Sequence, residues 1–257
     1  MTKIRMVHLS DIHFGQEVDG SLVYQDDIRD ALVRDCARQQ AELGDANGIL
    51  VTGDIAYAGK KAQYDRAGNW LGDLCKTVHC PGQAVHTIPG NHDIDLDEID
   101  FTVELLHTSL RNCAPDTVDQ TLARIYGDDP SVVTPGASAL YGKLAAYREF
   151  AERYQSDFDS EARPVSTKEL RFPSGHVLRF IGLTSVQVSD KSDVARKMIL
   201  GSAQYIFRPE PNVEYVVMCH HPFDWLKDRP RAMPYLRNRG RLLLTGHEHQ
   251  PAFRKVE

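Results

Sequence analysis

The 257-residue sequence lacks the cysteine patterns of a zinc ribbon or of a disulfide-bonded secreted domain. Its five cysteines are an odd number at irregular spacing, and no two of them form a CxxC pair, so we expect reduced and mostly buried thiols. Long apolar runs are missing too. No segment has the roughly 20 apolar residues of a membrane-spanning helix, and residues 1–10 lack the apolar core of a signal peptide. We therefore expect a cytoplasmic protein that does not enter a membrane.

Positive charge is also scarce relative to negative charge. The 30 Lys and Arg residues stand against 36 Asp and Glu, which gives a formal net charge of −6. The basic footprint of a general nucleic-acid-binding protein is therefore absent, although a local basic patch would still allow nucleic acid to bind. The hydrophobic fraction of 42% and the charged fraction of 26% are ordinary for a globular protein.

Short apolar segments alternate with helical segments in the first part of the sequence. Strands are expected at 4–9, 49–52 and 84–88, and helices at about 22–43 and 60–78. This alternation is typical of a mainly parallel sheet covered by helices. Further strands are expected at 167–172, 177–183, 213–219 and 241–245.

The middle of the sequence departs from this alternation. Residues 98–111 and 140–154 carry apolar side chains at helical spacing, and glycines and prolines between them indicate loops. We therefore predict that residues from about 97 to 164 form a helical insertion that lies over or beside a functional site. The rest is expected to complete a single domain over residues 1–257.

Polar clusters follow five of the expected strands. They are Asp11-Ile12-His13, Gly53-Asp54, Gly90-Asn91-His92-Asp93, His220-His221 and Gly246-His247-Glu248-His249. Because ligands of such sheets bind beyond the carboxyl ends of the strands, we expect these clusters to converge. Carboxylates, imidazoles and an amide oxygen without cysteine favour manganese, iron or zinc. The glycines beside Asp54, Asn91 and His247 would allow sharp turns that leave room for a ligand.

In this order the five clusters resemble the calcineurin-like metallophosphoesterase superfamily, whose pattern runs DxH, GD, GNH[DE], a later H and GHxH. The resemblance extends from Asp11 to His249. It implies an α/β/β/α sandwich with a dinuclear metal site at the carboxyl ends of the strands, and it leaves the helical insertion outside the shared core. It also implies metal-dependent hydrolysis of a phosphoric ester. The two divalent ions are expected to be Mn²⁺, with iron or zinc as alternatives.

The resemblance further assigns roles to individual residues. It assigns Asp11, His13 and His249 to one metal ion, Asn91, His220 and His247 to the other, and Asp54 to a bridge between them. His92 would assist the leaving group, and Asp93 would orient its ring unless it caps a helix beginning near Asp95. Two ions about 3.5–4 Å apart can share a hydroxide and the phosphoryl oxygens. A protonated His92 would then supply the proton that the leaving alkoxide needs.

Residues beside these clusters leave alternatives open. Tyr57 stands where purple acid phosphatases, a branch of the superfamily, have a metal-binding tyrosine. Since that branch lacks a histidine at the position of His13, we expect Tyr57 to lie behind the ligands. His221 is either a substrate contact or a packed side chain. The basic stretch from 227 to 241 is either a solvated face or a phosphate-binding rim in which Arg229 and Arg231 contact the substrate.

We therefore predict phosphodiester hydrolysis, because the DxH/GNHD variant resembles cyclic-nucleotide phosphodiesterases and double-strand-break repair nucleases more than acid phosphatases. A cyclic nucleotide, a nucleic acid or a nucleotide-derived diester is the expected substrate, and phosphomonoester hydrolysis is the alternative. A non-catalytic scaffold like the metallophosphoesterase-fold subunit of retromer is disfavoured, since every ligand position is filled. Family members usually continue through further strands, so we expect a longer protein with a downstream domain, or a partner that covers an open sheet edge.

Overall fold

The computed structural model describes residues 3–16, 22–127, 129, 132–160, 163–249 and 252. Within them, the strands form a three-stranded sheet in the order β1-β2-β3 and a four-stranded sheet in the order β4-β5-β6-β7. The first sheet consists of Met6–Leu9, Gly48–Thr52 and Val85–Ile88, and the second of Val165–Arg171, Val177–Leu183, Val213–Cys219 and Gly240–Leu244. All neighbouring strands are parallel except β4 and β5, which are antiparallel.

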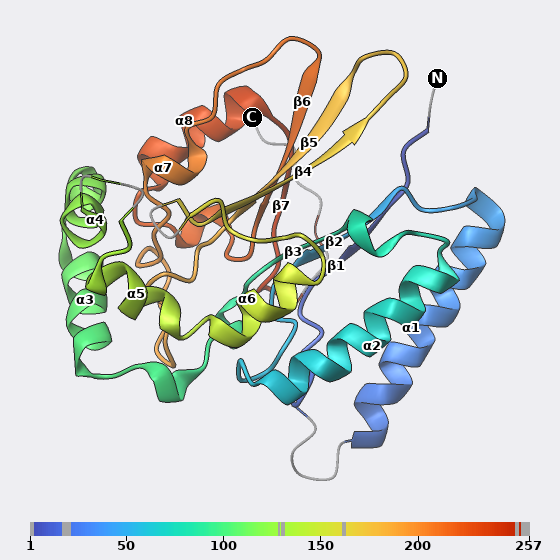
Figure 1. Ribbon diagram of the computed structural model, residues 1–257, viewed down its shortest axis with the longest axis horizontal. Helices are drawn as coiled ribbons and strands as arrows, with labels where there is room; N and C mark the ends of the chain where they lie inside the picture. The colour runs from blue at the N-terminus through green and yellow to red at the C-terminus, as the bar shows by residue number, and fades with distance from the viewer. Residues whose placement is uncertain are drawn as a thin grey trace.

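Helices cover the outer sides of both sheets. They are α1 (Leu22–Leu43), α2 (Lys61–Thr77), α3 (Phe101–Asn112), α4 (Val118–Tyr126), α5 (Pro135–Gly142), α6 (Ala145–Glu152), α7 (Ser202–Tyr205) and α8 (Arg229–Arg239). Figure 1 shows α1 and α2 outside the first sheet and α7 and α8 outside the second, with α3, α4 and α5 grouped at the end away from α1 and α2. The α/β/β/α sandwich expected from the sequence is confirmed. No helix of the described residues is long and apolar enough to cross a bilayer.

Two strands of the first sheet, β2 and β3, are buried on both faces. Every residue of β2 and β3 is buried, which explains their continuous apolar runs. Helix α2 packs beside them through Tyr64, Ala67, Leu71 and Leu74, whose spacing of three or four residues places them on one face. This rigid support holds the loops that follow β2 and β3.

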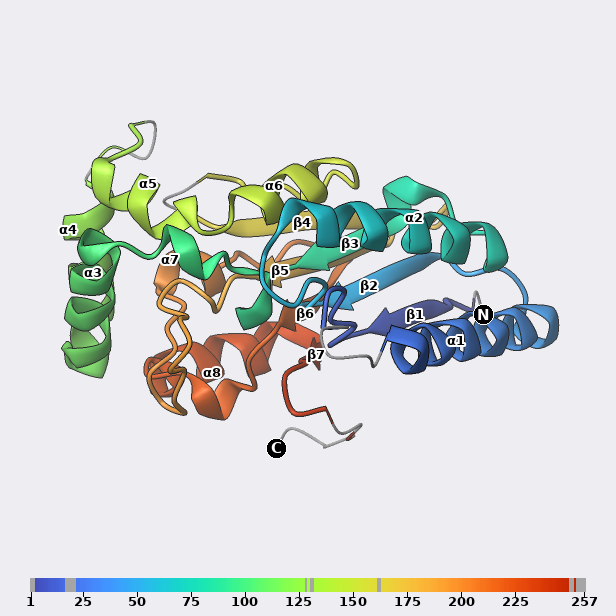
Figure 2. The ribbon, with the colours of Figure 1, turned by 90° about the horizontal axis from the view of Figure 1, so that it is seen from below.

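A small apolar cluster joins the two sheets. It contains Leu50, Ile88, Phe180, Val216 and Met218, which come from β2, β3, β5 and β6. The sheets are therefore packed against each other, and Figure 2 shows the strands of both sheets ending in the same central region. This packing brings the loops after β1, β2 and β3 close to those after β6 and β7.

The helical insertion was predicted only in part. The single helix expected over 140–154 is wrong, because α5 and α6 are separated at Lys143 and Leu144. Lys143 is completely buried, and its ammonium group donates hydrogen bonds to the carbonyls of Gln187 and Ser189 at 2.9 and 2.8 Å. A buried ammonium group needs such partners, so the chain turns to reach them. Helix α4 was missed.

Helix α8 was not predicted either. It contains Pro230 at its start and Pro234 inside, and its exposed side chains include Arg229, Arg231 and Arg237. Because of these residues, the sequence shows no clear apolar periodicity for the short buried face formed by Ala232, Met233 and Leu236. The stretch from 227 to 241, which the sequence left as a solvated face or a rim, is therefore largely a helix packed on β6 and β7.

Candidate metal centre

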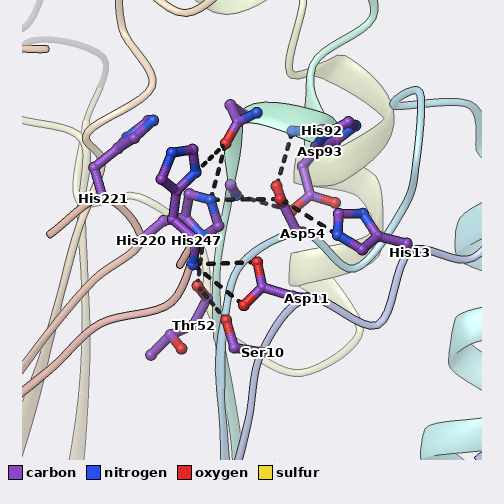
Figure 3. A network of polar contacts seen from close by, with 12 residues as sticks. Ser10, Asp11, His13, Thr52, Asp54, His92, Asp93, His220, His221 and His247 are labelled. Atoms are coloured by element: carbon purple, nitrogen blue, oxygen red, sulfur yellow. Dashed lines mark hydrogen bonds and ion pairs between the residues drawn. The ribbon is translucent and has the colours of Figure 1, made fainter. Parts of the chain in front are cut away.

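The five polar clusters converge at the carboxyl ends of β1, β2, β3, β6 and β7 (Figure 3). In one group, ligand atoms of Asp11, His13, Asp54 and His249 all lie within 4.8 Å of one another. In the other group, the same holds for His220, His221 and His247. Segments separated by more than 200 residues thus meet at one place, as expected for strand ends in such a fold.

Asp54 lies between the two groups. Its Oδ2 is 3.8 Å from His13 Nε2 and 3.5 Å from His220 Nε2, and the carboxylate is 1% exposed. Its Oδ1 accepts a hydrogen bond of 2.8 Å from the main-chain N–H of His92. Figure 3 shows His13 on one side of Asp54 and His220 and His247 on the other. This is where a carboxylate that bridges two ions would be.

The side chains assigned to the first metal position lie together: Asp11, His13 and His249. Among the described residues neither ring nitrogen of the buried His13 has a hydrogen-bond partner. Burial is the main cause that lowers the pKa of His13 to about 4, so the imidazole is neutral at pH 7. His249 Nε2 lies 3.7 Å from Asp11 Oδ1, and its ring stacks on that of His13. A divalent ion fits here because it would satisfy an imidazole that is otherwise buried without partners.

The side chains assigned to the second metal position also lie together: Asn91, His220 and His247. The carbonyl of Thr52 accepts a hydrogen bond of 2.8 Å from His220 Nδ1, so His220 Nε2 carries a lone pair. That nitrogen faces the amide oxygen Oδ1 of Asn91 at 3.0 Å, and His247 Nδ1 faces the same oxygen at 2.9 Å. Two imidazole nitrogens and an amide oxygen thus converge on one place, and these are atoms that bind divalent ions, so such an ion fits this group as well.

The backbone at these residues is in an uncommon conformation. Five of the seven proposed ligands have a positive φ angle: Asp11 (57°), His13 (52°), Asp54 (54°), His247 (73°) and His249 (52°). Residues with a side chain adopt this region at a cost, and they do so mostly at functional sites. The main-chain N–H of His247 helps to hold this backbone conformation, because it donates to both carboxylate oxygens of Asp11 at 3.1 and 3.2 Å.

Two glycines make room for the ligands. Gly53 has a φ of +92°, and a Cβ on it would lie 2.6 Å from His220 Nδ1. A Cβ on Gly90 would lie 2.2 Å from Asp54 Oδ1. The expectation that these positions must lack a side chain is confirmed, because the ligands of neighbouring loops occupy that space.

The sequence model of calcineurin-like phosphoesterases matches residues 4–251. The chain belongs to the calcineurin-like phosphoesterase family. Over 95 residues it is 32% identical to the uncharacterized metallophosphoesterase-like protein YydB of Bacillus subtilis (strain 168). This alignment covers 37% of the chain and 18% of that protein, so the chain spans less than a fifth of the relative. In a calcineurin-like phosphoesterase, ligand groups of this kind indicate a divalent-metal site.

His92 lies at the edge of the group formed by Asp11, His13 and His249. Its ring is 4.7 Å from that of His13 and stacks on Tyr57 at 5.0 Å. Its Nδ1 is 2.9 Å from the carbonyl oxygen of Tyr57, which makes Nδ1 the donor and leaves Nε2 available. The carbonyl and the ring of Tyr57 therefore orient the imidazole of His92.

Asp93 does not have the role that the sequence suggested. Within the described residues its carboxylate accepts hydrogen bonds from Ile55 N (3.2 Å), Ala56 N (2.8 Å), Gly90 N (2.8 Å) and the Tyr64 hydroxyl (2.9 Å), and none from His92. Burial and the nearby carboxylate of Asp54 raise the pKa of Asp93 to about 6. Asp93 thus joins the loop of Asp54 to the loop of Asn91, while Asp95 caps the following turn.

The three residues named as possible substrate contacts have partners within the chain. His221 is completely buried, so the alternative of a packed side chain describes it better. Arg229 Nε lies 2.8 Å from Asp224. Arg231 reaches the insertion, where it donates to the carbonyl of Asp116 at 2.9 Å and lies 3.6 Å from Asp119. Both arginines therefore have acidic or carbonyl partners in the chain itself.

Arg29 is a site residue that the sequence did not reveal. In α1 the apolar Ile28 is 52% exposed, whereas the neighbouring Arg29 is only 4% exposed. The guanidinium group lies 4.2 Å above the ring of Phe14 and donates to the carbonyls of Ile12 and His13 at 3.4 and 3.3 Å. Arg29 thereby supports the loop that carries Asp11. No local motif in the sequence distinguishes it from a surface arginine.

Proposed function

We propose that this phosphoesterase hydrolyses phosphodiesters with two divalent ions, of which Mn²⁺ is the first to test. The observation that carries the proposal is the convergence of six other ligand side chains around Asp54, with His92 at their edge. The substrate would be a cyclic nucleotide, a nucleic acid or a nucleotide-derived diester.

The two metal positions and Asp54 would hold the ions as described above. When bound, two such ions supply a water nucleophile of lowered pKa and offset the charge of the phosphoryl oxygens. The neutral imidazoles of His13 and His247 suit this role, because burial is the main cause that lowers the pKa of each to about 4. They keep their lone pairs throughout the neutral range.

His92 would act on the leaving group. Its Nδ1–H is held by the carbonyl of Tyr57, so Nε2 is the nitrogen that exchanges a proton. A protonated Nε2 would donate to the leaving oxygen when its bond to phosphorus breaks, and the imidazole would then recover its proton from solvent. Stacking on Tyr57 restricts the ring to the orientation that this transfer needs.

The preference for diesters rests on the DxH/GNHD variant, since His13 and His92 are both present. The direct test compares bis-p-nitrophenyl phosphate with p-nitrophenyl phosphate in Mn²⁺. We expect a higher kcat/KM for the diester, and a higher value for the monoester would replace the proposal with phosphomonoester hydrolysis.

A panel of cyclic nucleotides, single- and double-stranded DNA and RNA would then narrow the substrate. His92→Ala should lower kcat by about 10²–10⁴-fold, the usual contribution of a general acid. His79→Ala is the matched control, because His79 is an exposed histidine paired with Asp45. Full activity of the His92 variant on every substrate, or no hydrolysis by the wild-type protein with either ester, would contradict the proposal.

A further inference from the structure

Behind the second metal position lie two buried polar atoms that face each other. His221 Nε2 and Asp193 Oδ2 are 3.7 Å apart, and their side chains are 0% and 7% exposed. Neither atom has a hydrogen-bond partner within the described part of the chain. Buried polar atoms without partners are rare, so such a pair calls for an explanation.

Ser185 contacts the nitrogen of His221 that faces away from Asp193. The Ser185 hydroxyl oxygen accepts a hydrogen bond from the main-chain N–H of His221 at 3.3 Å. The same oxygen lies 2.9 Å from His221 Nδ1, and its hydroxyl hydrogen is free to be donated to that nitrogen. With Ser185 as the donor, the proton of the neutral ring is on Nε2, which faces the carboxylate of Asp193.

These contacts argue against His221 as a metal ligand and against a role of His221 in nucleophilic catalysis. Its two nitrogens are directed to Ser185 and Asp193, which leaves Asn91 as the third ligand beside His220 and His247. Ser185 is completely buried, so it cannot act as a nucleophile on an outside substrate although it belongs to a serine, histidine and aspartate set.

The His221 ring supports a proposed ligand. The centroid of the His221 ring lies 4.7 Å from that of His247. The His221 ring also stacks on Trp225, with the ring centroids 5.7 Å apart. Trp225 also meets the His247 ring edge to face at 4.3 Å. The orientation of His247 thus depends on the positions of these two neighbouring rings.

Asp193 is itself held by the helical insertion. Arg111 in the last turn of α3 donates to Asp193 Oδ1 at 2.9 Å and to the carbonyl of Val188 at 2.7 Å. Its other terminal nitrogen, Nη1, donates to Asp190 at 2.7 Å. Arg111 therefore fixes the segment from 188 to 193 against His221.

We propose that Asp193 is a positioning residue for the second metal position, which rests on the function proposed above. Held by Arg111, Asp193 fixes the tautomer and the orientation of His221, and His221 in turn fixes the ring of His247. The helical insertion thereby has a function, since α3 contributes to metal affinity without contributing a ligand.

The chain offers a matched pair of variants. Asp193→Asn and Asp190→Asn each remove one carboxylate that binds Arg111, but only Asp193 faces His221. We expect Asp193→Asn to weaken the second Mn²⁺ by about 10–100-fold, the usual effect of a residue that orients a ligand. Asp190→Asn should keep both ions. Calorimetric titration with Mn²⁺ and elemental analysis after desalting measure this directly.

A spectroscopic readout tests the same idea without metal. In the metal-free wild-type protein with ¹⁵N-labelled histidine, long-range imidazole correlations should show His221 protonated at Nε2. Asp193→Asn should change this signature, and Asp190→Asn should not. Should Asp193→Asn fail to fold, Ser185→Ala replaces it, and a mixed tautomer of His221 is then expected.

Three results would overturn the inference. The first is that Asp193→Asn binds two ions with wild-type affinity. The second is that both aspartate variants lose the same Mn²⁺ affinity, and the third is that His221 of the wild-type protein is protonated at Nδ1 alone. The proposed function fails in a different way, because the wild-type protein would then bind no Mn²⁺ or would hydrolyse no ester. If the wild-type protein binds two ions and hydrolyses a diester, and Asp193→Asn binds Mn²⁺ equally well, the proposed function stands. Only the inference about Asp193 is then wrong.

Discussion

At the scale of single residues, Asp93 illustrates how a buried carboxylate can serve a metal site without touching the metal. Its oxygens accept main-chain N–H groups from Ile55 and Ala56 on one side and from Gly90 on the other. Charge-assisted hydrogen bonds of this kind are stronger than those between neutral groups. They keep the loops of Asp54 and Asn91 at a fixed distance.

Replacing Asp93 by Asn should therefore destabilise the protein and the site together. The new amide group would place a donor against main-chain donors, at a cost of about 1.5–3 kcal/mol for the lost charged acceptor. Urea unfolding of the metal-free protein and Mn²⁺ titration measure the two effects. Tyr64→Phe removes only the hydroxyl donor to the same carboxylate, and it should cost about 1 kcal/mol. Equal decreases in the free energy of unfolding in Asp93→Asn and Tyr64→Phe would contradict this account.

The sequence revealed ligands better than it revealed the residues that support them. Asp54 and His247 each follow a glycine at the end of an apolar strand, so the signal is local. Arg29 and Asp193 act on residues that are distant along the chain or in another element, such as His221. Their role depends on tertiary packing, and a single sequence has no periodicity that reports it.

At the scale of elements, the strands were predicted better than the helices. The expected ranges of β5 and β6 match the observed ones, since apolar runs bounded by turns are distinctive. Helix α8 was missed because two prolines and a basic surface obscure its buried face. The break between α5 and α6 depends on the buried contacts of Lys143, which local spacing does not encode.

A buried histidine between strands predicts how stability depends on pH. His86 in β3 is completely buried, and its Nε2 lies 2.7 Å from the hydroxyl of Ser166 in β4. Burial, with a smaller contribution from Lys168, lowers the pKa of His86 to about 3. Below the unfolded pKa of about 6.5 the unfolded chain takes up a proton that the folded protein does not, so stability falls as the pH decreases.

Between pH 7.5 and 5.5 this histidine should account for a loss of about 1.4 kcal/mol in the free energy of unfolding. His86→Gln should remove that part of the loss, whatever its effect on stability at pH 7.5. Urea unfolding of the metal-free protein at both pH values measures it. His79→Gln changes an exposed histidine and should retain the wild-type dependence. An unchanged pH dependence in His86→Gln would show that His86 is not neutral in the folded protein.

At the scale of the whole molecule, the proposed ligands come from both sheets. The loops after β1, β2 and β3 supply Asp11, His13, Asp54 and Asn91, and the loops after β6 and β7 supply His220, His247 and His249. The apolar cluster between the sheets that includes Leu50 and Phe180 is small. Bound ions would add a further connection between the sheets, and they would offset the strain of the ligands with positive φ.

Removing metal should accordingly lower the melting temperature of the whole domain. Ions at 100 times their dissociation constant stabilise a folded protein by about 2.7 kcal/mol for each site. For a chain of this size, that corresponds to about 5–10 °C for one site. Scanning calorimetry with Mn²⁺ and with EDTA measures the difference. Asp54→Asn, which weakens the carboxylate between both positions, should lose most of the Mn²⁺-dependent increase, and His79→Ala should keep it. The same increase in Asp54→Asn and in the wild-type protein would mean that the stabilising Mn²⁺ does not bind at Asp54.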